Sequence, residues 1–207
     1  MMRNAKHLPL LFWLIGISLC ACHSNLRSNG PGSQLRALAD SIEQEAKTLD
    51  LVSAEKAFSA SQWAQENLRE FELLLEDQEM SVTREEGAII SEVSRARRLL
   101  KDQSKRRESI ANSQKRTLVQ LRGLATALES QATHDSQGTP IDSAYIALNL
   151  SRELQMGRTL KNSITETQTY ATQGIAIAER TKAGSDSLQT VLRGRLARLI
   201  LERSPAE

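Results

Sequence analysis

Apolar residues recur at steps of three and four from residue 33 onward, and this spacing places one hydrophobic stripe along an α-helix. The members of the first stripe are Leu35, Leu38, Ile42, Leu49 and Val52. Between residues 33 and 133 no proline occurs, and Gly87 and Gly123 are the only glycines. Strands would need alternating apolar residues and frequent turn residues, and this segment has neither. The pattern therefore predicts an all-α protein.

Local capping signals divide the stripe into helices. A single helix over 33–133 would be about 150 Å long, and the shorter remainder of the chain would leave much of it uncovered. We predict a break near Met80–Thr83, because Thr83 followed by Glu86 matches a capping box. A further break is possible at 50–53, where Ser53 could cap a new helix. The expected helices are 34–80 and 83–133.

The segment 133–139 is the strongest predicted boundary. Thr139 is expected to cap the last helix, with Pro140 at its first position and Asp142 near its positive end. Ser204 then begins a short tail over 204–207. The three helices 34–80, 83–133 and 140–203 would each be about 70–95 Å long. We therefore expect one domain over 33–203, an elongated antiparallel three-helix bundle or coiled coil.

The middle of the last helix has an apolar seam made of small residues. These are Ala171, Gly174, Ala178, Thr181 and Ser185. Small side chains allow helices to approach closely but bury little apolar area. The favoured interpretation is a thinly packed middle within the chain, and the alternative is a surface that a partner protein fills.

The N-terminus has the layout of an export signal. Arg3 and Lys6 precede an apolar run of about a dozen residues, too short to cross a bilayer. The run ends in Leu19-Cys20-Ala21-Cys22. This order resembles the lipobox of bacterial lipoproteins, in which the cysteine after a small residue is acylated.

The resemblance implies a signal peptide over 1–21, a lipid on Cys22 that holds the chain on a membrane, and a polar tether over 22–32. Cys20 is the weaker acceptor because Leu19 precedes it, and an ordinary secretory signal is the other alternative. His23, rather than aspartate, follows Cys22. By resemblance this favours an outer-membrane lipoprotein facing the periplasm over an inner-membrane one.

Removing this signal changes the charge and the cysteine content of the chain. The sequence has 27 basic and 25 acidic residues, and Arg3 and Lys6 account for the difference. A neutral mature chain gives no general reason to expect nucleic acid as a partner. No disulfide is expected, because Cys20 leaves with the signal and Cys22 carries the lipid.

Charge is unevenly distributed along the predicted helices. Residues 33–92 hold 14 acidic and 5 basic side chains, whereas residues 95–122 hold 2 acidic and 10 basic ones. The candidate site is a basic stripe formed by Arg95, Arg97, Arg98, Lys101, Lys105, Arg106 and Arg107. The favoured interpretation pairs this stripe with the acidic stretch 66–79 across a turn. The alternative is a contact surface for an anionic partner.

The sequence offers no recognisable catalytic, metal-binding or cofactor-binding group. After signal removal, only His23 and His134 remain as histidines, and no cluster of metal ligands accompanies them. We therefore predict a non-enzymatic, lipid-anchored helical scaffold or adaptor in a cell-envelope assembly, with an envelope protein or a second copy as partner. The alternative is a regulator that binds a membrane sensor or a cell-wall enzyme, and an enzyme is the least favoured class.

Overall fold

The structure, a computed structural model, describes residues 30–203 of the chain. The described residues form five helices: α1 (Pro31–Leu51), α2 (Ala54–Leu74), α3 (Arg84–Leu100), α4 (Gln103–Glu129) and α5 (Ser143–Arg203). They contain no strand, and a single isolated bridge joins His134 and Pro140. The predicted all-α class is confirmed. The signal 1–21, Cys22, the tether up to residue 29 and the tail 204–207 lie outside the described residues.

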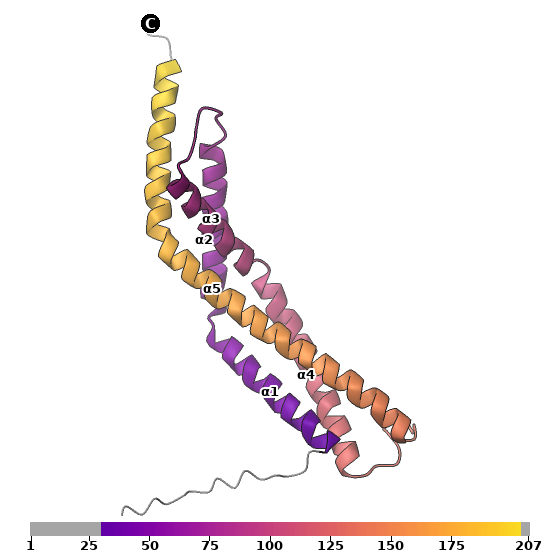
Figure 1. Cartoon of the computed structure of the whole chain (residues 1–207). Helices are drawn as coiled ribbons and strands as arrows, with labels where there is room; N and C mark the ends of the chain where they lie inside the picture. The colour runs from indigo at the N-terminus through magenta and orange to yellow at the C-terminus, as the bar shows by residue number, and fades with distance from the viewer. Residues whose placement is uncertain (1–29, 204–207) are drawn as a thin grey trace, which may run out of the picture.

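Figure 1 shows an elongated molecule whose helices follow one long axis. Helices α1 and α2 lead from one end to the other, α3 and α4 lead back, and α5 follows the whole length. Helix α5 has 61 residues, which corresponds to about 90 Å, and it bends in its C-terminal part (Figure 1). It contacts each of the other four helices.

Two separate hydrophobic cores lie along α5. The first core joins α1, α4 and the N-terminal part of α5, and its fully buried side chains include Leu35, Ile42 and Leu121. The second core joins α2, α3 and the C-terminal part of α5 around Phe71 and Val93. Burying one such side chain contributes about 1.5–3 kcal/mol. Each half of the molecule therefore has an apolar centre of its own.

The small residues of α5 let the chain's own helices approach. A Cβ atom at Gly174 would lie 2.5 Å from Leu100 Cγ, and one at Gly157 would lie 2.6 Å from Leu38 Cδ2. Ala171, Thr181 and Ser185 are also buried within the chain. The chain's own helices already cover these positions, so the interpretation of the seam as a surface for a partner is wrong for them; Ala178 of the same seam lines a groove.

Two of the predicted caps are confirmed. The Ser53 side chain accepts a hydrogen bond from the backbone N–H of Lys56 at 3.1 Å. Thr83 and Glu86 form a complete capping box at the start of α3.

The predicted helix 34–80 is wrong in its extent. The chain breaks at residues 52–53 into α1 and α2, and α2 ends at Leu74. Helix α1 also begins earlier than predicted, since Pro31 occupies its first turn after Gly30. Pro31 and Gly32 therefore belong to α1 and not to the tether, and Gly32 is buried against α4.

The predicted helix 83–133 is also wrong, because it is divided between Leu100 and Gln103. Asp102 lies in the left-handed region at φ 59°, which an α-helix cannot continue through. Aspartate is one of the few non-glycine residues that tolerate this conformation. No glycine or proline marks this break in the sequence, which explains why the pattern did not predict it.

The last helix begins at Ser143 and is capped by Asp142, so the prediction of Thr139 as the cap is wrong. Asp142 Oδ1 accepts a hydrogen bond from the backbone N–H of Tyr145 at 2.8 Å. Thr139 is held in the preceding loop, where its backbone N–H donates to Asp135 Oδ1 at 2.8 Å. The Thr139 carbonyl also accepts from the Asp135 N–H at 2.9 Å.

Candidate functional site

The two helix breaks, at residues 52–53 and 101–102, lie beside each other at one level of the molecule, which we call the waist. Arg107, near the start of α4, donates from Nη2 to the Val52 carbonyl at 2.7 Å and from Nη1 to the Leu49 carbonyl at 3.3 Å. Carbonyls at a helix end lack helical partners, so Arg107 supplies donors for the end of α1. Arg107 therefore connects the start of α4 with the end of α1.

Helix α5 passes through the waist without a break. Its Tyr170 ring lies 5.2 Å from the Arg106 guanidinium carbon, within the range of a cation–π contact. The Tyr170 hydroxyl donates to Glu166 at 2.5 Å. This hydrogen bond, and the negative charge of Glu166, raise the pKa of the tyrosine. Arg106 and Arg107 are thus used within the fold.

The remaining five residues of the basic stripe are exposed. Arg95 lies 3.6 Å from Glu92 and Lys105 lies 3.9 Å from Asp102, both one helical turn away. Exposed pairs of this kind contribute little, about 0–1 kcal/mol. Arg97, Arg98 and Lys101 have neither a hydrogen bond nor an ion pair with any residue in 30–203. We call these three residues the waist cations.

The acidic side chains of residues 66–79 that form ion pairs do so with α5 and not with the basic stripe. Arg203 contacts Asp77 at 2.6 Å and Glu79 at 3.0 Å, and Arg193 pairs with Glu70. The prediction that residues 66–79 pair with the stripe starting at Arg95 is therefore wrong. The C-terminal part of α5 lies along the same acidic stretch and carries four arginines of its own.

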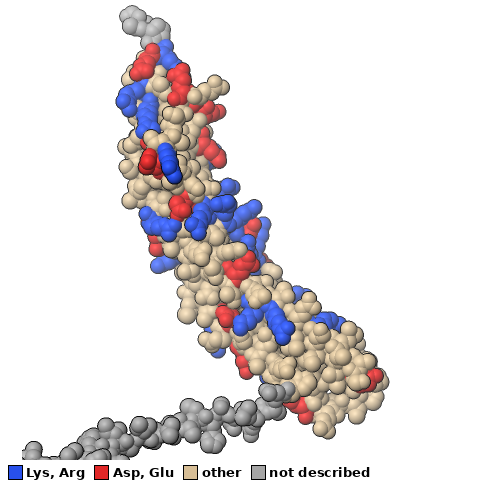
Figure 2. All heavy atoms as spheres, in the orientation of Figure 1, with Lys and Arg blue, Asp and Glu red and all other residues tan. Residues whose placement is uncertain are grey.

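Two further pairs show the same arrangement. Arg195 Nη2 lies 2.7 Å from Glu86 Oε1, and Arg180 pairs with Glu92. The hydrogen bond from Arg195, together with the capping contact to Thr83, lowers the pKa of Glu86. Because these carboxylates are occupied by α5, they do not neutralise the waist cations. Figure 2 shows charged side chains over the middle and the C-terminal end, and a less charged surface at the opposite end.

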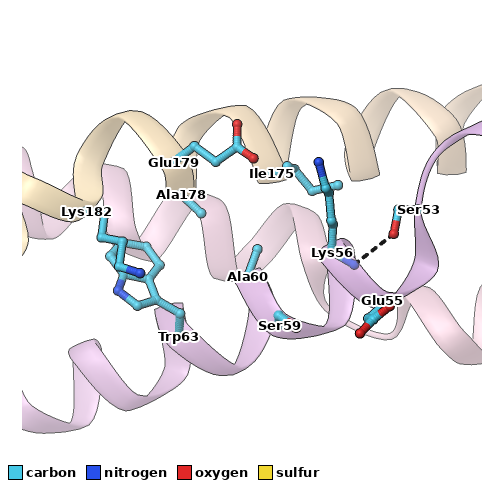
Figure 3. Close-up of a pocket in the computed structure, with 10 residues that line it drawn as sticks. All are labelled: Ser53, Glu55, Lys56, Ser59, Ala60, Trp63, Ile175, Ala178, Glu179 and Lys182. Atoms are coloured by element: carbon cyan, nitrogen blue, oxygen red, sulfur yellow. Dashed lines mark hydrogen bonds between the residues drawn. The ribbon is translucent and has the colours of Figure 1, made fainter.

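An open groove of about 500 Å³ lies between the start of α2 and α5, next to the waist. Trp63, Ala60 and Ala178 supply apolar surface, while Lys56, Lys182 and Glu179 stand at its rim (Figure 3). The Ser53 cap of α2 closes one end. The groove therefore combines an apolar floor with charges of both signs.

Two exposed apolar side chains lie on either side of Ser53. Leu51 is 85% exposed and Phe58 is 55% exposed. The hydrophobic pattern did not predict this region. Its available signal was the placement of Phe58 and Trp63, two of the five aromatics beyond the signal, directly after the Ser53 cap.

The chain matches no protein-family model, no curated protein and no solved structure. Within residues 30–203, no helix combines the length and the hydrophobicity that a bilayer crossing requires. The same residues contain no group of three or more His, Cys, Asp or Glu side chains placed to hold a metal ion.

Proposed function

We propose that the protein is a non-enzymatic, lipid-anchored scaffold or adaptor of the bacterial envelope. The lipid would be attached to Cys22, and the helical part would extend into the periplasm from the outer membrane as two successive three-helix bundles that share α5. The lipobox sequence supports the anchor and the location. The three waist cations, Arg97, Arg98 and Lys101, which have no ion-pair partner within residues 30–203, support the role of contact surface.

The waist is suited to a protein partner with an acidic face. Arg180, Arg193 and Arg195 of α5 pair with carboxylates of α2 and α3. The waist cations have no such partner within residues 30–203. The same level also carries the apolar groove of Trp63 and the exposed Leu51 and Phe58. Protein interfaces combine an apolar centre with a polar rim and are enriched in aromatic residues and arginine.

A polyanion such as a nucleic acid fits this surface less well. Glu55 and Glu179 line the groove together with Lys56 and Lys182, so the surface beside the waist has no uniform positive charge. Proteins that bind nucleic acid need a continuous positive surface along the phosphate backbone. The mixed rim favours a partner that itself carries charged and apolar side chains.

The experiment compares two charge-reversed variants of the full chain in cells. The first is Arg97→Glu, Arg98→Glu, Lys101→Glu. The control is Lys115→Glu, Arg116→Glu, Arg158→Glu, which changes the net charge equally at exposed residues away from the waist. In-cell crosslinking followed by mass spectrometry should show envelope partners with wild type and the control, and lose them with the first variant. Equal recovery from both variants would contradict the waist as the contact surface.

A separate experiment tests the anchor. Labelling with a palmitate analogue should modify the wild-type chain and leave Cys22→Ala unmodified, because Cys22 is the proposed acceptor. Label that persists in Cys22→Ala would contradict this acceptor. Wild-type protein that takes no label would contradict lipid anchoring altogether.

A further inference from the structure

The two halves of the molecule meet at the waist, and α5 is the only described helix that passes through it. The chain is interrupted there at residues 52–53, between α1 and α2, and at residues 101–102, between α3 and α4. The two hydrophobic cores have no residue in common. A change in the angle between the halves would therefore be absorbed by the two short connections and by α5, and would leave each core intact.

The side chains that α5 buries at the waist are small or polar. Ile164 is the last α5 residue of the first core, and Ile177 is the first α5 residue of the second core. Between them the buried residues of α5 are Thr167, Ala171 and Gly174. Small side chains bury little apolar area. This layer therefore contributes less to holding the two halves together than either core contributes to its own half.

Two buried polar atoms at the start of α4 lack hydrogen-bond partners among residues 30–203. They are Oε1 of Gln103, a residue that is 6% exposed, and Nε of Arg107. The two residues lie one helical turn apart, yet these atoms do not bond to each other. A buried polar atom without a partner costs about 1–3 kcal/mol. These costs weaken the observed arrangement at the waist relative to arrangements that satisfy the two atoms.

Helix α5 also has its poorest helix-forming sequence at this level. Residues 162–174 include four threonines and one glycine, and no leucine, methionine, arginine or lysine, whereas residues 150–161 contain seven of the latter four types. Relative to alanine, threonine costs up to about 0.7 kcal/mol in a helix and glycine about 1 kcal/mol. The Thr169 hydroxyl donates to the Thr165 carbonyl at 2.8 Å. Such a bond to a carbonyl four residues earlier often bends a helix.

Arg107 restrains the first of the two connections. Its Nη2 donates to the carbonyl of Val52, which lies in the connection between α1 and α2. This hydrogen bond holds the connection against α4. The backbone of residues 52–53 is thus fixed by a side chain and not by a core.

We propose that the waist is a hinge, about which the half with α1 and α4 changes its angle relative to the half with α2 and α3. Hinges consist of a few residues in loops or at the ends of elements, and the connections 52–53 and 101–102 are of this kind. Helix α5 bends within residues 162–174 and remains a helix, which limits the range of the motion. Arg107 opposes the motion by holding Val52.

The test measures distances across the waist and within each half by double electron–electron resonance on the purified full chain. Nitroxide labels are attached to p-acetylphenylalanine, which replaces exposed residues in pairs. The pair Glu66 and Lys115 spans the waist. The pair Lys115 and Arg158 lies in the first half, and the pair Glu66 and Ser91 lies in the second. We expect a wider distance distribution for the pair across the waist than for either pair within a half.

Two variants should change the width of the distribution across the waist in opposite directions. Arg107→Ala frees the connection at Val52 and should widen it. Thr165→Ala combined with Thr169→Ala strengthens α5 at the waist and should narrow it. In both variants the distributions within each half should keep their widths.

The matched control is Thr159→Ala combined with Thr190→Ala, which makes the same two changes at exposed positions of α5 outside residues 162–174. This control should leave the width across the waist unchanged. The threonine variants alter exposed side chains, so they keep the proposal testable even if Arg107→Ala fails to fold.

Three results would overturn the hinge. The first is a distribution across the waist that is no wider than those within the halves. The second is an unchanged width across the waist in a folded Arg107→Ala, or a widening that is equal within the halves. The third is equal narrowing by the two threonine pairs. No partner protein takes part in these measurements, so their outcome is independent of the proposed scaffold role.

Discussion

The two halves of the molecule share α5 but keep their helices in register by different means. In the first core, close contacts at glycines fix how the helices fit together, as at Gly157 against Leu38 and at Gly32 against Glu129. Arginine pairs lie along the edges of both halves, as Arg122–Glu43 does in the first and Arg195–Glu86 in the second. In the second core, a network of buried polar groups performs this task in addition. The difference shows that one long helix can support two kinds of packing specificity within a single chain.

The buried hydrogen-bond network of the second half is centred on Asn67. Its Oδ1 accepts from the Ser185 hydroxyl at 2.6 Å and from Gln189 Nε2 at 2.8 Å, and its Nδ2 donates to the Trp63 carbonyl at 2.8 Å. Ser185 is fully buried, and Asn67 and Gln189 are each 8% exposed. Any sliding of α2 along α5 would separate these partners, so they select one register at some cost in stability.

The largest predicted effect concerns the independence of the two cores. Phe71→Ala should cost about 3–5 kcal/mol and Leu121→Ala about 2–5 kcal/mol, because both side chains are fully buried. Hydrogen exchange should rise mainly in α2, α3 and C-terminal α5 for Phe71→Ala, and in α1, α4 and N-terminal α5 for Leu121→Ala. Faster exchange spread equally over all helices in both variants would show one cooperative unit.

The next largest effect concerns the buried hydrogen-bond network of Asn67. Asn67→Leu removes the acceptor for Ser185 and Gln189 and leaves both buried, so we expect a loss of about 1–3 kcal/mol in urea unfolding. Adding Ser185→Ala and Gln189→Leu removes the orphaned groups and should restore most of the stability. If the triple variant is as unstable as the single one, hydrogen bonding is not the cause.

A smaller effect tests close packing at the waist. Gly174→Ala would bring a Cβ to 2.5 Å from Leu100 Cγ. The resulting crowding should outweigh the better helix propensity of alanine and cost about 1 kcal/mol. Gly123→Ala is the matched control, since nothing lies within 4 Å of its Cβ position. In that variant the free energy of unfolding should increase by about 0.5–1 kcal/mol. A decrease in the free energy of unfolding of both variants would refute the explanation by crowding.

The smallest effect concerns the edge pair Glu86–Arg195. Arg195 holds the pKa of Glu86 below its usual value of 4.5, so the stabilisation is present above about pH 4.5 and is lost as pH falls through the lowered pKa. Glu86→Gln retains the capping contact but loses the charge. Wild type should therefore have the higher Tm at pH 7, and this advantage should shrink as the pH is lowered towards 2.5. An undiminished advantage at pH 2.5 would exclude ionisation as its source.

Local signals predicted the elements whose ends are decided locally. The box of Thr83 and Glu86, the Ser53 cap and the loop after residue 133 all depend on neighbouring residues, and the structure contains them. The break at Asp102 depends on the packing of α4 at the waist, including the contact of Arg107 with the end of α1. The start of α5 was misplaced because Thr139 is engaged by Asp135 within the loop.

The candidate site shows the same limit. The density of positive charge at residues 95–107 could be read from the sequence, but its partners could not. The spacing of residues along the chain does not show which face of α5 packs against α2 and α3. In the structure, four arginines of α5 form ion pairs with the carboxylates that were expected to pair with the basic stripe or that lie near it.

The unbroken course of α5 sets a minimum distance between the two ends of the molecule. With 61 residues in one helix, the loop 130–142 and the loop 75–83 are separated by a large part of about 90 Å. A compact domain of 100 residues has a radius of gyration of about 13 Å, so no single small domain can touch both loops. Two such domains can occupy the two ends at the same time without colliding, and the length of α5 then determines how far apart they are held.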